Sequence, residues 1–176
     1  MELTKKDKTV KYIAYCGILM LCALLQNTAG LFPEIGGAHC FILIPVCVLI
    51  SLDEDEKAAA LLGLFAGALW DIVSAEHMGY NCIFLMLACF VSSTLVTYVF
   101  RNTFAVSMVC TAASIALYCL IYWLIFMVIQ KSDGSVWTLF YFYIPCAVYT
   151  MALTPLLYLI LKPLSRKLNK INDFDE

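Results

Sequence analysis

The charged residues of this chain are few and grouped, and the long apolar stretches between the groups predict membrane-spanning helices. No charged residue occurs from Thr103 to Gln130 or from Gly134 to Leu161. An apolar stretch of about 17–25 residues is long enough to cross a bilayer as a helix. The expected spans are residues 12–29, 35–52, 58–75, 80–100, 103–129 and 136–161. The predicted fold is therefore an all-α membrane protein, a six-transmembrane-helix bundle that forms a single domain over residues 1–176.

The second and third expected spans are the shortest, and a re-entrant hairpin is the alternative for them. Their connection, residues 53–57, carries four acids in succession followed by Lys57. Four carboxylates could not lie inside hydrocarbon, where each charge is costly. The sequence therefore predicts that both segments cross the membrane.

The basic residues give the expected orientation. With six spans, ten of the eleven lysines and arginines fall on one side of the membrane, and Lys131 alone falls on the other. The positive-inside rule makes the basic side cytoplasmic and places both termini there. Residues 164–176 are expected to form a cytoplasmic amphipathic tail, with Leu164, Leu168 and Ile171 on one side of a helix that lies on the membrane surface. Contact with a cytoskeletal partner is the alternative for this tail.

Composition supports this class of protein. Hydrophobic residues make up 63% of the chain and charged residues 14%, and the mean hydropathy is +0.89. Such a chain has too little polar surface for a soluble protein, and the lipid bilayer is its expected surroundings. The first apolar segment is too long for a signal peptide and is expected to be retained. No basic patch with interleaved aromatic residues indicates nucleic-acid binding.

Residues with catalytic or metal-binding potential form no recognisable site. The nine cysteines include no Cys-x-x-Cys pair and are expected to be small buried apolar residues. His39 and His77 have no other histidine nearby in sequence to complete a metal site. No nucleophile elbow, His-Glu-x-x-His motif or phosphate-binding glycine loop is present. We therefore expect no catalytic residue, cofactor or metal, although a membrane enzyme acting on lipid would need only polar residues that meet from different spans.

The third span carries the most informative pattern. Gly63, Gly67 and Asp71 recur every fourth residue, so they share one helical face along which a neighbouring helix can approach closely. An ionisable residue within such a segment usually has a partner or a function. Asp71 could brace the fold by accepting hydrogen bonds from backbone N–H groups, either in the turn of residues 74–79 or at the start of the fourth span. Alternatively, it could anchor a partner helix or a small ligand.

Residues near Asp71 extend this candidate site. Ser74 and Asn81 could belong to the same hydrogen-bonded cluster, and Gly79 is expected to be needed for the turn between them. Aromatic residues later in the chain, namely Tyr118, Tyr122, Trp123 and the run from Trp137 to Tyr143, are expected to face lipid or the membrane interface, with the wall of a ligand pocket as the alternative. Prolines 45, 145 and 155 are expected to kink or break their helices.

The pattern Gly63-x-x-x-Gly67-x-x-x-Asp71-x-x-Ser74, followed by Gly79-x-Asn81, resembles the central signature of the bacterial rod shape-determining protein MreD family. The length, the helix count, the two cytoplasmic termini and the Phe32-Pro33 connection after the first span are similar too. MreD sequences often carry a Pro-Asp pair on entering the second span. This chain departs from that pattern, because residues 36–39 read Gly-Gly-Ala-His.

The resemblance implies a non-enzymatic subunit of the cell-elongation machinery in the bacterial plasma membrane. Such a subunit binds MreC, a membrane-anchored protein. Through MreC it helps to link MreB filaments beneath the membrane to the peptidoglycan-synthesising glycosyltransferase and transpeptidase outside.

The expected fold is also similar to that of the substrate-binding subunits of energy-coupling-factor vitamin transporters, which gives an alternative function. That function predicts an Ala-x-x-x-Ala seam in the first span for the coupling subunit. Ala14 and Ala23 in that span do not have this spacing, and the pair Ala112 and Ala116 lies in the fifth span. The sequence therefore favours the scaffold over the transporter.

Overall fold

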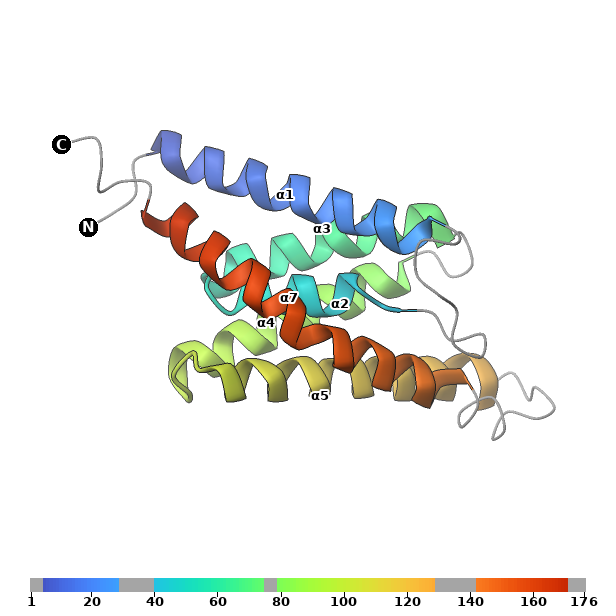
Figure 1. Ribbon diagram of the computed structural model, residues 1–176. Coiled ribbons are helices and arrows are strands. Elements are labelled where there is room, and N and C mark those ends of the chain that lie inside the picture. The colour runs from blue at the N-terminus through green and yellow to red at the C-terminus, as the bar shows by residue number, and fades with distance from the viewer. Residues whose placement is uncertain (1–4, 29–39, 75–78, 129–141, 171–176) are drawn as a thin grey trace.

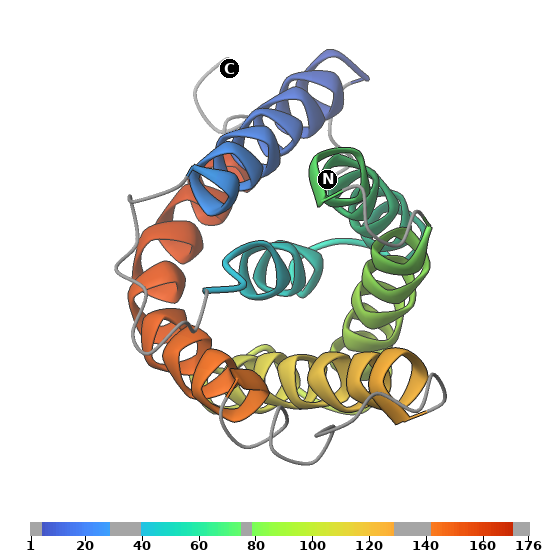
Figure 2. The same ribbon diagram turned by 90° about the vertical axis from the view of Figure 1, so that its right-hand side faces the viewer.

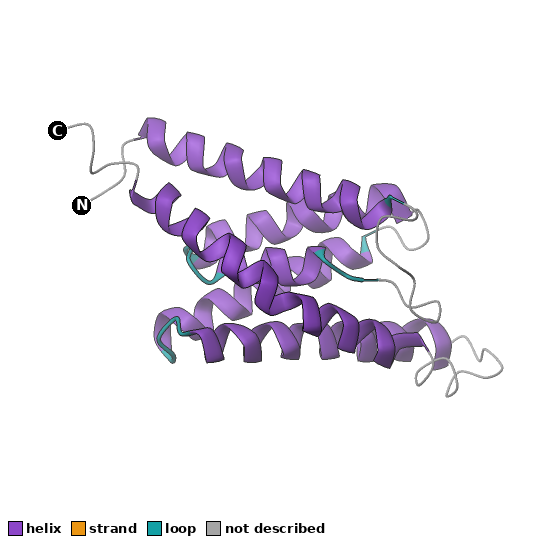
Figure 3. Cartoon of the chain, viewed as in Figure 1, coloured by secondary structure: helices purple, strands orange, loops and turns teal. Residues whose placement is uncertain are grey.

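The computed structural model describes residues 5–28, 40–74, 79–128 and 142–170, and these residues are helical with short connections (Figures 1 and 3). The helices are α1 (Lys5–Asn27), α2 (Leu43–Ser51), α3 (Glu56–Ser74), α4 (Tyr80–Tyr98), α5 (Phe104–Tyr122) and α7 (Ile144–Lys170). A π-helical segment, η1 (Trp123–Val128), continues α5. Five of the described helices, α1, α3, α4, α5 and α7, are long and apolar enough to cross a membrane. The predicted all-helical, multi-pass membrane class is confirmed.

The five long helices form a ring, and α2 lies inside it (Figure 2). The order around the ring is α1, α3, α4, α5 and α7, and α2 contacts all five of them. Every residue of α2 is buried. The interior of the described ring is therefore filled by a helix of this chain.

The second predicted span differs from the structure. Residues 35–52 were expected to cross as one helix, but the described helix begins only at Leu43 and has nine residues. At about 1.5 Å per residue it is about 14 Å long, less than half of the roughly 30 Å hydrocarbon core. The described part of the chain thus holds five membrane-length helices and one short buried helix, where six spans were expected. Apolar content cannot distinguish a helix that crosses among lipids from one that is enclosed by protein.

Side chains from the surrounding ring bind the backbone that leads into α2. The N–H of Phe41 donates to Thr150 Oγ1 on α7 at 3.0 Å, and the N–H of Leu43 donates to Gln26 Oε1 on α1 at 2.9 Å. Irregular backbone at membrane depth needs such protein partners. Pro45 lies in the first turn of α2, where its missing N–H costs little. The described helix begins at Leu43, two residues before this proline, so Pro45 lies at the start of α2 and not in its interior.

Both described ends of the chain, the connection between α2 and α3, and the connection between α4 and α5 lie at one end of the bundle (Figure 1). This end is called the terminal end below. Lys57 follows the first of these connections, and Arg101 lies in the second. The described basic residues therefore gather at the terminal end, as the six-span interpretation required. That this end faces the cytoplasm stays a prediction.

Candidate functional site

Asp71, near the end of α3, binds the start of α4. Its Oδ2 accepts hydrogen bonds from the N–H groups of Gly79 at 2.9 Å and Cys82 at 3.1 Å, and its Oδ1 accepts one from the N–H of Asn81 at 3.3 Å. The first N–H groups of a helix have no acceptor within the helix, and the helix dipole favours negative charge there. Asp71 is only 4% exposed. The carboxylate therefore supplies the acceptors that the buried start of α4 needs.

The conformation of Gly79 brings these N–H groups together. Gly79 precedes the first residue of α4 and has a φ of +95°, in the left-handed region. A residue with a side chain adopts this conformation at a cost that glycine does not have. The glycine therefore allows the chain to enter α4 with its first N–H groups directed at Asp71.

The two other glycines of the motif face the backbone of α4. A Cβ atom on Gly63 would overlap the carbonyl oxygen of Leu85, and one on Gly67 would overlap the backbone of Asn81 and Cys82. Helices that carry small residues along one face can bring their backbones this close. The glycine face thus fixes α3 against α4, and Asp71 holds the same pair of helices at one end.

Asn81 extends the Asp71 site into an aromatic cluster. The hydroxyl of Tyr118 on α5 donates to Asn81 Oδ1 at 3.0 Å. Five aromatic rings lie with their centroids 5.1–5.8 Å from that of Tyr118, namely those of Phe41, Trp70, Tyr80, Phe84 and Tyr122. Among the described residues, Ser74 makes no hydrogen bond with Asp71 or Asn81. The structure therefore brings together five of the six candidate residues along one interface, and Ser74 ends α3 beside them.

Tyr118 was expected to face lipid, and this expectation is wrong. The residue is 4% exposed and lies among the other rings of the cluster. The rings contact one another within this cluster. Residues 137–141 of the other aromatic run lie outside the described part of the chain, and Tyr143 at its end is buried.

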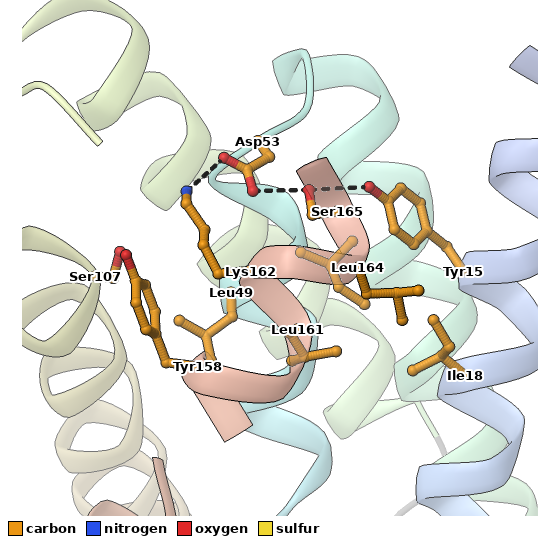
Figure 4. Close-up of a pocket in the computed structure, with 11 residues that line it drawn as sticks. Tyr15, Ile18, Leu49, Asp53, Ser107, Tyr158, Leu161, Lys162, Leu164 and Ser165 are labelled. Atoms are coloured by element: carbon orange, nitrogen blue, oxygen red, sulfur yellow. Dashed lines mark hydrogen bonds and ion pairs between the residues drawn. The ribbon is translucent and has the colours of Figure 1, made fainter. Parts of the chain in front are cut away.

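A second polar cluster lies at the terminal end and was not predicted. Asp53, in the connection after α2, accepts hydrogen bonds at Oδ1 from Lys162 Nζ at 2.8 Å and from Asn102 Nδ2 at 2.5 Å. Its Oδ2 accepts one from Ser165 Oγ at 2.8 Å, and the Tyr15 hydroxyl lies 3.3 Å from that Oγ (Figure 4). One carboxylate thus joins the α2–α3 connection to α7, to the start of α5 and, through Ser165, to α1.

Glu54 makes the neighbouring ion pair. Lys11 Nζ on α1 lies 2.5 Å from Glu54 Oε1, an oxygen that has no other described hydrogen-bond partner, and both side chains are buried. The hydroxyl of Ser93 on α4 donates to the Glu54 backbone carbonyl at 2.6 Å. Burial raises the pKa of the Glu54 carboxyl above its ordinary value, and the Lys11 ammonium opposes this shift. The acidic connection therefore ties several helices of the ring together at this end.

The cavity beside Asp53 is small. It holds about 10 Å³ between Tyr15, Tyr158 and Lys162, among other residues (Figure 4). That is roughly the space of one water molecule. The cluster therefore has no room for a substrate. In the sequence, the run of acids and the basic residues expected at the same end of the bundle were the signals that could have indicated a polar cluster there. They do not show which acid forms an ion pair with which base.

The cysteines and histidines add no further site within the described residues. All nine thiols are free, and each is buried or half-buried. The Sγ atoms of Cys47 and Cys89 lie 3.2 Å apart in the core. No group of three potential metal ligands occurs among the described residues. His39 and His77 fall outside that part of the chain.

Comparison with known proteins gives one match. The family model described as rod shape-determining protein MreD matches residues 8–168, which is nearly the whole chain. No curated protein and no solved structure matches, so the similarity to energy-coupling-factor subunits stays a prediction. The matched region includes the glycine face, Asp71 and the acidic connection. The chain belongs to the rod shape-determining protein MreD family.

Proposed function

We propose that this protein is a non-enzymatic scaffold subunit of the bacterial cell-elongation machinery, one that binds MreC in the plasma membrane. Membership of the MreD family supports a role in rod shape determination. Through MreC, the subunit helps to link MreB filaments to the glycosyltransferase and transpeptidase that build peptidoglycan. Its own contribution is to offer a stable helical surface to other membrane proteins.

The filled interior is the observation that carries this proposal. The buried helix α2 occupies the centre of the ring, and the cavity at the terminal end is the size of one water molecule. Binding sites for small molecules are usually cavities of about 300–1,000 Å³ that enclose most of the ligand. The ring of described helices, with α2 filling its interior and apolar residues on its exterior, is better suited to contact proteins through its outer surface. No comparable structural observation supports the alternative function in vitamin transport.

The polar groups near Asp71 support a structural role for that residue. Both carboxylate oxygens already accept hydrogen bonds from the start of α4, and the residue is almost fully buried. We infer that Asp71 braces the α3–α4 pair and affects partners only by keeping that pair in place.

Purification of the tagged protein from its native membrane in mild detergent tests the proposal. We expect MreC to co-elute with the wild-type protein. The Asp71→Ala variant should be less abundant in the membrane, and the part that does fold should retain MreC. Loss of MreC at normal abundance would assign Asp71 to partner contact. Absence of MreC from the wild-type preparation would contradict the scaffold function itself.

A further inference from the structure

The outer surface of the ring has an open hollow between α4 and α5. This α4–α5 groove encloses about 560 Å³ and is lined almost wholly by apolar atoms. It exists because α4 packs closely along α3 but contacts α5 only sparsely. The lining residues Leu87, Val91 and Val109 are at least half exposed. The groove is therefore a concave apolar surface that the described part of this chain leaves uncovered.

Ser92 is a polar group in this groove. The residue is 4% exposed and lines the groove, yet its hydroxyl makes no hydrogen bond with any described residue. The nearby Ser114 hydroxyl, by contrast, donates to the carbonyl of Cys110 at 2.9 Å. An occupant that covered this hydroxyl without offering it a hydrogen-bond partner would bury a polar group at a cost in free energy. The occupant of the groove should therefore offer an acceptor at this depth, which an acyl chain lacks and a polypeptide provides.

The length of the groove also favours a polypeptide. Its lining residues on α5 run from Ala105 to Ile121, a distance of about 24 Å at roughly 1.5 Å per residue. One leaflet contributes only about 15 Å, half of the roughly 30 Å hydrocarbon core. One lipid tail would leave part of the groove unfilled, and lipid would have to enter from both leaflets to fill it, whereas a single transmembrane helix can follow it across both leaflets.

The shape of the surface argues against a second copy of this chain as the occupant. A two-fold dimer brings the same patch of both subunits together, so the patch must be complementary to itself. Two concave grooves placed face to face would leave a void. A single helix is convex and fits the groove, and the small residues Ala88 and Ala113 among the lining let its backbone approach closely.

We propose that the α4–α5 groove seats the single transmembrane helix of a membrane-anchored partner. The Ser92 hydroxyl donates a hydrogen bond to a backbone carbonyl or polar side chain of that helix. This inference rests on the proposed function, in which the partner is MreC.

Site-specific photo-crosslinking in cells tests the location. A photoreactive amino acid is placed at Val109 in the groove or, as a control, at Val148 on the outer face of α7, because the two valines are 67% and 64% exposed. We expect a crosslink to MreC from position 109 and none from position 148. A crosslink from 148 only, from neither position, or from 109 to a second copy of this chain would overturn the proposal.

Filling the groove gives a second test. Ala113→Leu adds a side chain inside the groove, whereas Ala116→Leu adds the same side chain at an exposed position of α5 outside the lining residues. We expect Ala113→Leu to reduce co-purified MreC at least tenfold with membrane abundance unchanged, and Ser92→Ala to reduce it severalfold. Ala116→Leu should bind as the wild type does. Equal binding by all variants would overturn the groove as the site while leaving the proposed function intact. A wild-type protein that binds no MreC would instead remove the proposed function.

Discussion

The carboxylate of Asp71, near the end of α3, accepts a hydrogen bond from the backbone N–H of Gly79, just before α4, at 2.9 Å. The same carboxylate also accepts bonds from two N–H groups in the first turn of α4. Gly63 and Gly67, on the same face of α3, bring its backbone against α4. Close packing and a capped helix start therefore hold one pair of helices together.

Removing the Asp71 carboxylate should destabilise this pair. Each buried N–H group left without an acceptor costs about 1–3 kcal/mol, so we expect Asp71→Ala to lower the unfolding free energy by roughly 3 kcal/mol or more. Asp71→Asn keeps one acceptor oxygen and should lose less. Thermal unfolding in detergent measures both. The control is Lys57→Ala, at an exposed position in the first turn of α3, which should change stability by no more than about 0.5 kcal/mol. Wild-type stability in Asp71→Ala would contradict the bracing role.

A methyl group on the glycine face should force α3 and α4 apart. We expect Gly67→Ala to cost about 1–3 kcal/mol, the usual range for overpacking, because its Cβ would overlap the backbone of Asn81. Gly17→Ala in α1 is the matched control, since a Cβ there meets no atom within 4 Å. Alanine inside a helix is favoured over glycine by about 0.5–1 kcal/mol, so this control should be neutral or slightly stabilising. If both variants melt alike, the close approach of the two helices is wrong.

The buried ion pair at the terminal end should show strong coupling. Lys11→Met leaves the Glu54 carboxylate without its cation, and removing one partner of a buried pair costs about 3–5 kcal/mol. Replacing both partners with apolar residues is often nearly neutral. We therefore expect Lys11→Met to lose about 3 kcal/mol and the Lys11→Met/Glu54→Leu double variant to recover most of it. Lys8→Met, at an exposed position of α1, serves as the control. Equal losses in the single and double variants would show that the pair does not couple.

The raised pKa of Glu54 predicts the sign of a pH effect. A folded-state pKa above the ordinary value of 4.5 means that the folded protein holds more protons than the unfolded chain between these two values. The stability contributed by this group is fully present below the ordinary value and is lost as the pH rises through the raised one. Glu54→Gln cannot lose that proton. Its melting temperature should therefore rise relative to that of the wild type as the pH increases through this window, and a relative fall would contradict the shift.

Some of this architecture follows from sequence because it depends on short-range periodicity. The spacing of Gly63, Gly67 and Asp71 places them on one helical face in any α-helix, and the neighbouring helix α4 follows α3 after only a few residues in the sequence. For the same reason, the sequence predicted that Asp71 could accept hydrogen bonds from the start of α4, as one of two possible roles for this residue. Apolar length likewise predicted the long helices, and the ends of α3 and α4 lie within two residues of the expected ones. By contrast, α1 begins seven residues before the expected start, and α7 extends nine residues beyond the expected end.

Other features depend on contacts between segments that are distant in the chain. The burial of α2 could not be predicted, because an apolar run reads the same whether lipid or protein surrounds it. Lys11 and Glu54 meet only when α1 lies beside the α2–α3 connection. Tyr118 is buried because three other segments supply four rings around it. The surroundings of these residues can be assigned only from the three-dimensional arrangement of the helices.

Native mass spectrometry of the protein released from its own membrane tests the central claim most directly, because it weighs the intact assembly together with anything bound to it. A scaffold with a filled interior predicts a species whose mass is that of this chain plus MreC, with no small molecule retained in fixed proportion. A species that lacks MreC and carries one small molecule per chain would contradict the account.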